Sequence, residues 1–301
     1  MMLESSTALA NPNASSEAEM TKLKQLLGPT GFYEPRGKDA VLLIHGLTGT
    51  PAEMRHLARK LRRKGFSVMV PQLAGHCGSI KELKRSSWQD WYASVDAAFR
   101  FLGDRHHQVF VSGLSMGALL ALELAAKHGQ QVAGVGLLSP TFFYDGWNMP
   151  KLRRSLLPLA LMTPLKHFMY WHEVAPYGIK CERTRAMVHA VLENRDAHAA
   201  EKVGIFKTPL VTVHESSKLI WHVTQSLAQV QCPVLVVHST EDDMASTKNV
   251  DFVTQRIASK DVETWLIDNT YHVLTLDRRK DDVAERVGNF FSLRAQPAIA
   301  A

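Results

Sequence analysis

The sequence is poor in the features that mark several classes of protein. Its 301 residues include only three cysteines, Cys77, Cys181 and Cys232. Their odd number and the lack of a C-x-x-C spacing argue against a disulfide framework and against a structural zinc site. No run approaches the 18 apolar residues of a membrane-spanning helix, and the first twenty residues lack the basic start and apolar core of a signal peptide. We therefore expect a reducing, cytoplasmic location.

Charge of one sign is not concentrated anywhere in the chain. The formal net charge is +6 and the pI is about 9.2, values that permit contact with anionic lipid or nucleic acid. The basic residues nevertheless occur in short groups, such as residues 59–64 with the sequence RKLRRK. Because such a group is typical of the solvated face of a helix, we expect no nucleic-acid partner.

A regular alternation of strand and helix patterns is present from about residue 40. Short β-rich apolar runs alternate with amphipathic segments, and this order predicts parallel strands joined by crossover helices. The expected fold class is therefore α/β, with a mostly parallel central sheet flanked by helices. The predicted strands cover residues 40–45, 66–71, 108–112, 132–139, 233–238 and 262–267.

Three helices can be placed between these strands. They begin at Pro51, at Ser87 and just after Ser115. The second has Asp90 three residues after Ser87, a pairing that resembles a capping box. The aromatic residues of that helix recur at core spacing, which indicates packing rather than a cofactor role.

The alternation stops at Pro140 and resumes only at Pro233. Strands and helices of a doubly covered sheet follow one another closely, so this gap indicates an insertion. We interpret residues 141–230 as a helical cap or lid set into an α/β core made of residues 26–140 and 231–294.

The two ends of the chain and one segment of the cap each have a separate predicted property. Residues 1–25 are expected to form a disordered tail, and residues 295–301 a frayed end. Residues 149–170 of the cap are apolar and basic, which suits a helix covering the pocket and an interfacial lipid contact equally well. Both readings of that segment stay open.

The motif G-x-S-x-G occupies residues 113–117 as GLSMG. Small residues often surround a serine by chance, so the motif gains meaning from a strand before it and a helix after it. Both are predicted here, because residues 109–111 are apolar and β-rich and an Ala- and Leu-rich helical pattern follows from residue 118. The two glycines permit the strained turn that presents a serine hydroxyl above a sheet. We predict Ser115 as a nucleophile.

A serine nucleophile needs a histidine to remove its proton and a carboxylate to orient that histidine. Carboxylates follow one late predicted strand and a histidine follows the next, both at the edge where open α/β sheets hold their ligands. We predict His272 as the base and Asp242 as its orienting acid. Asp243 is the main alternative to Asp242, and Glu241 and Asp268 are weaker ones.

The oxyanion of the tetrahedral intermediate needs two backbone N–H donors. One is expected from Met116, which follows the nucleophile, and the other from the loop after an early strand. The segment HGLTG at residues 45–49 fits that loop, and its glycines permit a tight bend. We therefore predict Leu47 N–H as the second donor, and we interpret His45 as shaping the loop rather than as a base.

Other signals in the sequence predict neither a metal nor an organic cofactor. The segment GVGLLS at residues 134–139 faintly echoes a dinucleotide-binding pattern, but it lies within a predicted strand instead of opening a helix. His106 and His107, and likewise His167 and His172, match neither H-E-x-x-H nor a zinc ligand set. We interpret these histidines as solvated.

Together, these segments resemble bacterial carboxylesterases of the thermostable carboxylesterase and monoacylglycerol lipase group within the α/β-hydrolase superfamily. The resemblance covers residues 38–292 apart from the insertion. It implies hydrolysis of short- to medium-chain carboxylic esters or monoacylglycerols without a cofactor, with Asp242 as triad acid and His272 as triad histidine. Its most specific segments are LLIHGLTGTPAEMRHLARKL, GLSMG, LVVHSTEDDM and YHVLTLD.

The chain departs from that group in two places. Cys77 stands where relatives usually have the second glycine of Gly-His-Gly, a change expected to reshape the site entrance. The insertion also looks longer than the compact cap of the small esterases.

The alternatives share the fold. A triad alone does not distinguish esters from thioesters or amides, so a serine peptidase, thioesterase or acyltransferase is the alternative function. Haloalkane dehalogenases need an aspartate and polyester synthases usually need a cysteine at the nucleophile position, so Ser115 disfavours both. A non-catalytic binding protein of this fold is expected to lack a triad residue, and here none is missing.

Overall fold

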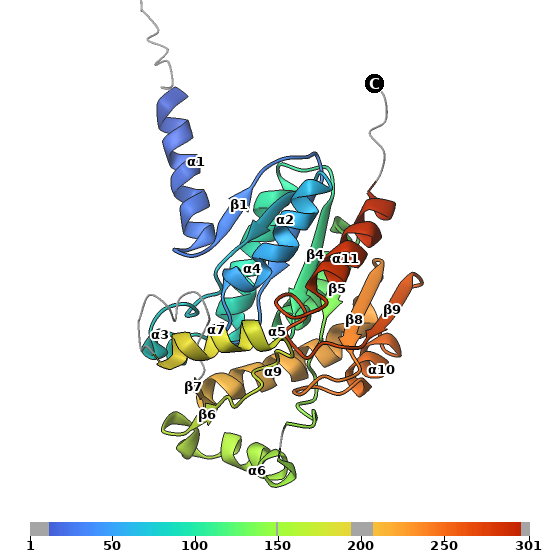
Figure 1. Cartoon of the computed structure of the whole chain (residues 1–301). Helices are drawn as coiled ribbons and strands as arrows, with labels where there is room; N and C mark the ends of the chain where they lie inside the picture. Colours follow the sequence, from blue (N-terminus) through green and yellow to red (C-terminus); the bar gives the residue numbers. More distant parts are fainter. Residues whose placement is uncertain (1–11, 149, 194–206, 296–301) are drawn as a thin grey trace, which may run out of the picture.

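The computed structural model describes residues 12–148, 150–193 and 207–295 of the chain. Its centre is a seven-stranded sheet in the order β1-β3-β2-β4-β5-β8-β9 (Figure 1). β1 is antiparallel to β3, and every other neighbouring pair in this sheet is parallel. The strands are β1 (Phe32–Glu34), β2 (Ala40–Ile44), β3 (Ser67–Val70), β4 (Val109–Leu114), β5 (Val132–Leu138), β8 (Val234–Ser239) and β9 (Val262–Ile267).

The six predicted strands are confirmed, and their ends agree with prediction to within two residues. The largest difference is in β4, which continues to Leu114 because Gly113 and Leu114 still pair with Leu137 and Leu138 of β5. β1 has no counterpart among the predicted strands, since three residues are too few to show a periodic pattern.

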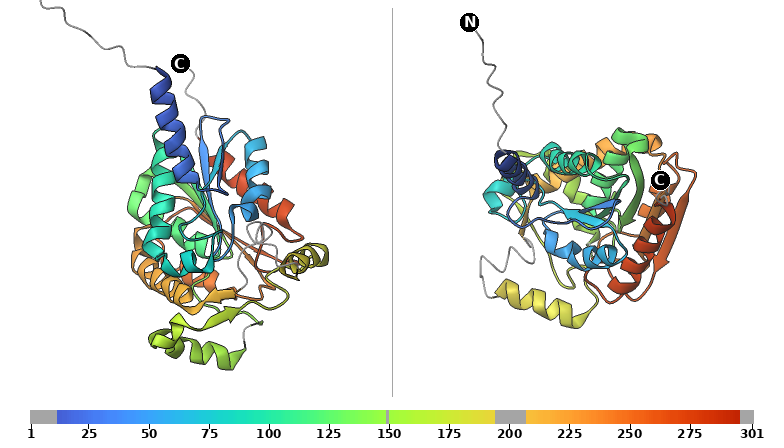
Figure 2. Two further views of the ribbon diagram at one scale, coloured as in Figure 1. Left: turned by 90° about the vertical axis from the view of Figure 1, so that its left-hand side faces the viewer. Right: turned by 90° about the horizontal axis from the view of Figure 1, so that it is seen from above.

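Helices cover both faces of the sheet (Figure 2). Val111 of β4 lies in one core with α4, α5, α9 (Leu210–Ser226) and α10, whereas its neighbour Phe110 lies in the other core with α2 and α11. This alternation is what the pleat of a strand requires. The helices of the core are α2 (Arg55–Arg63), α3 (Ile80–Arg85), α4 (Trp88–Gly103), α5 (Met116–His128), α10 (Lys248–Thr254) and α11 (Lys280–Arg294).

The three predicted helix starts are confirmed. Pro51 opens the 3₁₀ turn η1 (Pro51–Met54), which leads into α2. α4 follows Ser87, whose hydroxyl accepts the Asp90 N–H while the Asp90 carboxylate accepts the Ser87 N–H. α5 begins immediately after Ser115. Among the described residues, no helix is both long enough and apolar enough to cross a membrane.

The N-terminal segment differs from its expectation. Pro12–Leu27 forms the helix α1, within the stretch where the sequence predicts a disordered tail, and residues 1–11 of that prediction lie outside the described part. Leu23 and Leu26 pack against the core beside α4, and Glu19 pairs with Arg105. These contacts come from residues far along the chain, so the local composition does not reveal them.

Between β5 and β8 the chain leaves the sheet, as the pattern predicts. This segment holds α6 (Lys151–Met162), η3 (Pro164–His167), β6 (Tyr170–His172), α7 (Glu182–Glu193), β7 (Lys207–Pro209) and α9 (Leu210–Ser226). β6 and β7 form a separate antiparallel pair, and α6 lies beyond them at one end of the molecule (Figure 1). α9 packs on α5 and α4, so it connects the segment to the core. Residues 149 and 194–206 of the predicted cap, and 296–301 of the predicted frayed end, lie outside the described part.

Candidate active site

Ser115 sits on a sharp turn between β4 and α5. Its φ is +56°, in the left-handed region that non-glycine residues rarely adopt, and its N–H donates to Leu138 O at 2.8 Å. A Cβ at Gly113 would lie 2.0 Å from Gly117 O, and one at Gly117 would lie 2.4 Å from Ile44 O. Both flanking glycines are therefore required for strand, turn and helix to approach this closely.

The loops after β8 and β9 bring two side chains to this turn. His272 Nε2 lies 2.9 Å from Ser115 Oγ, and His272 Nδ1 lies 2.7 Å from Asp242 Oδ2. Asp242 Oδ1 accepts the N–H groups of Met244 and Ala245, each at 2.8 Å. The predicted serine, histidine and acid are thus connected in one chain of hydrogen bonds, with both the histidine and the acid buried.

The competing carboxylates have other partners. Asp243 Oδ2 accepts the Gly178 N–H at 3.1 Å. Glu241 pairs with Lys180, and Asp268 pairs with Arg279 on the surface. Of the four acidic residues considered from the sequence, Asp242 is the one whose carboxylate contacts the His272 ring.

Burial and charge act in opposite directions on this pair. Burial raises the pKa of Asp242, but the charge and hydrogen bond of His272 outweigh it, so the pKa ends below its ordinary value. Burial lowers the pKa of His272, but the Asp242 carboxylate, aided by Asp243 and Glu173, raises it above its ordinary value. An imidazolium formed at His272 is therefore stabilised where a transferred proton would reside.

The two residues expected to supply oxyanion donors are Met116, which follows Ser115 directly, and Leu47. Met116 is the first residue of α5, a position whose N–H has no acceptor within the helix. Leu47 lines the same cavity as Ser115. Beside it, His45 Nδ1–H donates to Gly46 O at 2.9 Å and His45 Nε2 accepts the Leu73 N–H at 3.2 Å. Burial and the neighbouring His76 lower the pKa of His45 to about 3, so His45 is neutral, with both ring nitrogens hydrogen-bonded to backbone groups.

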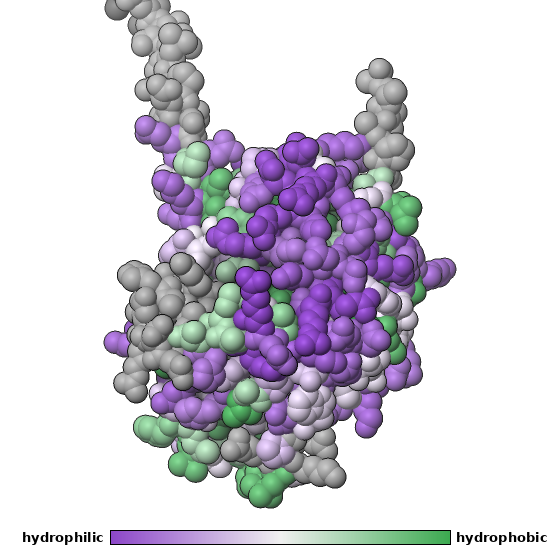
Figure 3. Space-filling model, viewed as in Figure 1, coloured by the Kyte–Doolittle hydropathy of each residue, from purple (hydrophilic) through white to green (hydrophobic). Residues whose placement is uncertain are grey.

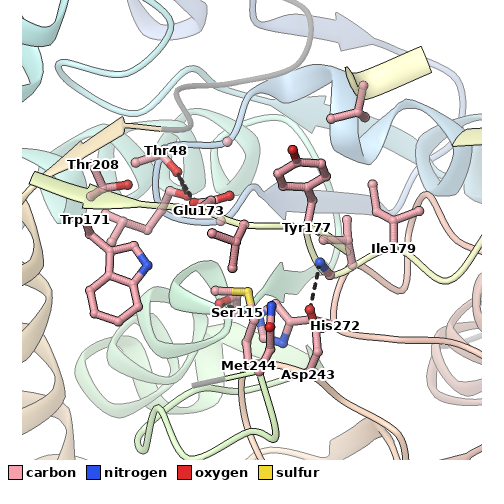
Figure 4. Close-up of a pocket in the computed structure, with 18 of the residues that line it drawn as sticks. Thr48, Ser115, Trp171, Glu173, Tyr177, Ile179, Thr208, Asp243, Met244 and His272 are labelled. Atoms are coloured by element: carbon pink, nitrogen blue, oxygen red, sulfur yellow. Dashed lines mark hydrogen bonds between the residues drawn. The ribbon is translucent and has the colours of Figure 1, made fainter. Parts of the chain in front are cut away.

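A cavity of about 610 Å³ opens above Ser115, a volume typical of small-molecule sites. Its walls come from the core loops and from the segment between β5 and β8. Figure 4 shows Ser115 and His272 near its centre, with Trp171 on one side and Ile179 on another. The apolar part of the lining includes Leu47, Leu157, Trp171, Val174, Ile179, Met187, Val188, Val213, Val273 and Leu276.

Three polar residues of the site were not singled out by sequence reasoning. Thr141 Oγ1 lies 3.2 Å from Ser115 Oγ and donates to Ser139 O at 3.0 Å. Glu53 and Glu173 line the cavity, and removal from bulk water raises the pKa of each to about 7. Glu53 has a sequence signal, since it stands three residues after Thr50 as in a capping box, but Glu173 lies in a segment without periodicity.

Cys77 lies beside the loop that carries Leu47 and Gly49. It adopts φ +62°, the left-handed conformation in which glycine is the less strained residue, and its Sγ lies 3.9 Å from Gly49 O. The cavity lining does not include Cys77. The substitution at this position therefore acts on the loop next to the site, and the three cysteines of the chain are all thiols.

The chain is similar to known hydrolases over most of its length. A family model described as serine aminopeptidase, S33, matches residues 35–279. The chain is 31% identical over 270 residues to a thermostable monoacylglycerol lipase of Bacillus sp. (strain H-257), a match that covers 90% of this chain and 97% of that protein. It is 24% identical over 269 residues to a carboxylesterase of Bacillus subtilis (strain 168), covering 88% and 97%.

The fold is also similar to that of a solved structure of a lipolytic enzyme. One from work on LipS and LipT, two metagenome-derived lipolytic enzymes, has 27% identity and a TM-score of 0.75, and the match covers 89% of this chain and 99% of that one. The expected fold class and resemblance are thereby confirmed. The chain belongs to the serine aminopeptidase S33 family and, within it, to the group of bacterial esterases and monoacylglycerol lipases with the α/β-hydrolase fold.

Proposed function

We propose that this enzyme hydrolyses carboxylic esters, with Ser115 as nucleophile, His272 as general base and Asp242 as the acid that orients it. The proposal rests on the chain of hydrogen bonds from Ser115 Oγ through His272 to Asp242. This is the constellation that serine hydrolases on unrelated folds share. Ser115 and His272 both line a largely apolar cavity of about 610 Å³.

The proposed reaction uses each of these groups in turn. Ser115 Oγ attacks the ester carbonyl carbon while its proton passes to His272 Nε2, and the Leu47 and Met116 N–H groups hold the oxyanion. The alcohol then leaves with the proton from His272. Water, deprotonated by the same histidine, attacks the acyl-enzyme and releases the carboxylic acid.

For the substrate, we propose short- to medium-chain acyl esters or monoacylglycerols. The apolar walls contributed by Leu157, Trp171 and Val188 suit an acyl chain, while Glu53 and Glu173 supply polar groups on the side of the Leu47 loop. The names of the Bacillus relatives point to the same two substrate classes.

The test is activity against p-nitrophenyl esters of rising chain length and against monoacylglycerols, with Ser115→Ala as the inactive reference. We expect Ser115→Ala to lower kcat by more than about 10³-fold and to abolish labelling by a fluorophosphonate probe, because the acyl-enzyme of the proposed mechanism forms on Ser115 Oγ. Wild-type turnover by a folded Ser115→Ala variant would reject the assignment.

The alternative on the same fold is a serine peptidase, thioesterase or acyltransferase. The family's description as a serine aminopeptidase is the observation that favours testing amides. Matched ester, thioester and aminoacyl-amide substrates separate these activities, and a preference for the amide would replace ester hydrolysis as the function.

A lipid surface is the second partner that we propose. α6 and the turn after it expose an apolar surface, which we call the α6 face; Leu152 is 71% exposed, Met162 81% and Phe168 78%. Figure 3 shows hydrophobic groups gathered at the end of the molecule where α6 lies. The α6 face consists of Leu152, Leu156, Leu159, Met162, Leu165 and Phe168.

The sequence suits α6 to two roles, covering the pocket and contacting lipid, and we assign these roles to different sides of the helix. Leu157 lines the cavity, whereas Leu156 and Leu159 are more than half exposed. We expect the triple change Leu152→Ser, Leu156→Ser and Leu159→Ser to reduce sedimentation with phosphatidylglycerol-containing vesicles while leaving turnover of a water-soluble ester unchanged. Leu293→Ser on α11, also an exposed leucine, is the matched control.

For the location we propose the cytoplasm, on the ground that Cys77, Cys181 and Cys232 are all thiols. Recovery of the protein in the cytosolic rather than the periplasmic or secreted fraction tests this proposal.

A further inference from the structure

The loop of residues 46–50, between β2 and η1, carries Leu47 in a conformation that needs outside support. Thr48 has φ +61°, where a β-branched residue is strained. The Gly49 N–H donates to Gly46 O at 3.2 Å, which closes the loop into a tight turn. Strain of this kind persists only where surrounding groups over-determine the backbone.

Glu53 supplies support from the core side. Its Oε2 accepts the Gly46 N–H and its Oε1 accepts the Thr50 N–H, each at 3.3 Å. One carboxylate therefore holds both ends of the loop. A Cβ at Gly49 would lie 2.0 Å from Glu53 Oε1, so the glycine leaves the space that the carboxylate fills.

A second capping box in the chain shows what Glu53 does beyond capping a helix. At the start of α3, Glu82 Oε2 accepts the N–H and the hydroxyl of Ser79, and both bonds stay within that helix start. A Cβ at Gly78 would lie 2.2 Å from Glu82 Oε2, so the two motifs share their local shape. Glu53 differs because it also reaches back to Gly46, a bond that capping does not require.

The Gly46 bond bears directly on Leu47. Gly46 C=O and Leu47 N–H belong to one planar peptide group and point in opposite directions. The oxygen of that group is held by His45 Nδ1–H, and the preceding peptide group is held at Gly46 N–H by Glu53. With both peptide groups fixed, the direction of the Leu47 N–H is fixed as well.

The same loop is contacted from the other side. Thr48 Oγ1 lies 3.5 Å from Glu173 Oε1, which belongs to the segment between β6 and α7 (Figure 4). Gly46 also lies beside the serine turn, since a Cβ at Gly46 would be in ordinary van der Waals contact with Leu114 O at 3.6 Å and Ser115 Cβ at 3.7 Å.

We propose that Glu53 is a positioning residue for the oxyanion hole, which holds the Gly46 and Thr50 N–H groups so that Leu47 N–H is aimed at the carbonyl oxygen of a bound ester. This role rests on the proposed function, because it presupposes attack by Ser115. Glu53 itself touches neither the reacting carbonyl nor the nucleophile's proton in this scheme.

Loss of an oxyanion donor lowers kcat by about 10²–10³-fold. A donor that is still present but no longer held in one direction should lower kcat by a smaller factor. In Glu53→Gln the side-chain NH2 group replaces one of the two acceptor oxygens, so one of the two backbone N–H groups loses its acceptor. We expect this variant to lower kcat about 10-fold, and Glu53→Ala to lower it about 100-fold. KM should change less than about twofold, because the lost interaction forms mainly in the transition state.

The experiment measures kcat and KM on p-nitrophenyl butyrate, together with the affinity of a trifluoromethyl ketone, whose adduct with Ser115 places an oxyanion in the hole. Affinity should fall in parallel with kcat. Glu82→Gln, at the matched motif of α3, should change neither quantity. Thermal unfolding and circular dichroism establish that each variant is folded.

A second variant covers the case in which Glu53→Ala does not fold. Gly49→Ala keeps the glutamate but occupies the space of its carboxylate, so it should reproduce the loss in kcat. Gly78→Ala is its control. Unchanged kcat in folded Glu53→Gln and Gly49→Ala, with Ser115 still labelled by the fluorophosphonate, would overturn the positioning role alone. Failure of wild-type Ser115 to label would overturn the proposed function and this role with it.

Discussion

The backbone N–H of Lys180 donates to Asp277 Oδ2 at 2.9 Å, which joins the segment between β5 and β8 to the loop that carries His272. Asp277 is buried and accepts three further hydrogen bonds, from the N–H of Cys181 at 2.7 Å, the N–H of Tyr271 at 2.7 Å and the hydroxyl of Thr270 at 2.9 Å. One carboxylate therefore connects the two residues before His272 to the segment between β5 and β8.

We expect Asp277→Ala to lower the free energy of unfolding by about 3 kcal/mol, because four donors lose a buried acceptor. Chemical denaturation with urea measures this quantity. Asp268→Ala is the matched control, since that exposed carboxylate belongs to the same loop and pairs with Arg279 at the surface; its effect should stay within about 0.5 kcal/mol. Equal effects of the two changes would contradict the role given to Asp277.

The two neighbouring aspartates should behave differently when each is changed to asparagine. Asp242→Asn should lower kcat by about 10⁴-fold, because the amide no longer holds the His272 ring in the productive tautomer. Asp243→Asn should lower kcat by less than about 10-fold. The Asp243 carboxylate accepts a hydrogen bond from the Gly178 N–H, and an amide oxygen can accept the same bond. Steady-state kinetics on one ester substrate decides, and a reversed order would make Asp243 the triad acid.

The pH profile follows from the direction of the His272 shift. The proposed mechanism needs neutral His272, and the pKa of this residue lies above the ordinary 6.5 because the Asp242 carboxylate overcomes the effect of burial. Activity should therefore fall as the pH drops through a value above 6.5. A plot of kcat/KM against pH tests this, and an acid limb centred below pH 6 would contradict it. Asp243→Asn should move the limb to lower pH, because Asp243 also raises this pKa.

Glu173 should make stability depend on pH with the opposite sign from an ordinary paired carboxylate. Burial, with the charge of Glu53, raises its pKa from 4.5 to about 7. A carboxyl whose pKa is raised by folding contributes stability below its unfolded pKa, and that contribution is lost as the pH rises through the folded pKa. The loss should therefore develop between pH 4.5 and about 7.

The variant Glu173→Gln isolates this effect. Between pH 5 and pH 8 the wild-type protein should lose about 2 kcal/mol of unfolding free energy that the variant does not lose. Urea denaturation at the two pH values measures the difference, and Glu182→Gln, at an exposed position on α7, serves as control. Identical pH slopes for wild type and Glu173→Gln would show that Glu173 ionises normally.

Much of the core could be predicted because its signals are local. The strands ending before Ser115, Asp242 and His272 are apolar runs bounded by turns, and parallel strands bring their carboxyl ends to one edge. Chain order and local pattern therefore indicate which side chains meet, and the His272 ring lies within hydrogen-bonding distance of both Ser115 and Asp242.

The remaining site residues depend on contacts that no local pattern encodes. Glu173 faces the cavity only because β6 pairs with β7, some 35 residues further along the chain. Thr141 reaches Ser115 because Ser139, with φ +45°, turns the chain after β5. α1 is a similar case on the outside of the fold, since its apolar residues find their partners on α4.

The left-handed backbone of Ser115 has a consequence for the evolution of the enzyme. A side chain with φ +56° costs about 1–2 kcal/mol relative to glycine, so the turn that suits the fold best is one without a nucleophile. The Ser115→Gly variant should be more stable than the wild-type protein and should lack hydrolase activity. Selection for stability alone would favour glycine here, and the proposed role of Ser115 as nucleophile accounts for a serine at this strained position.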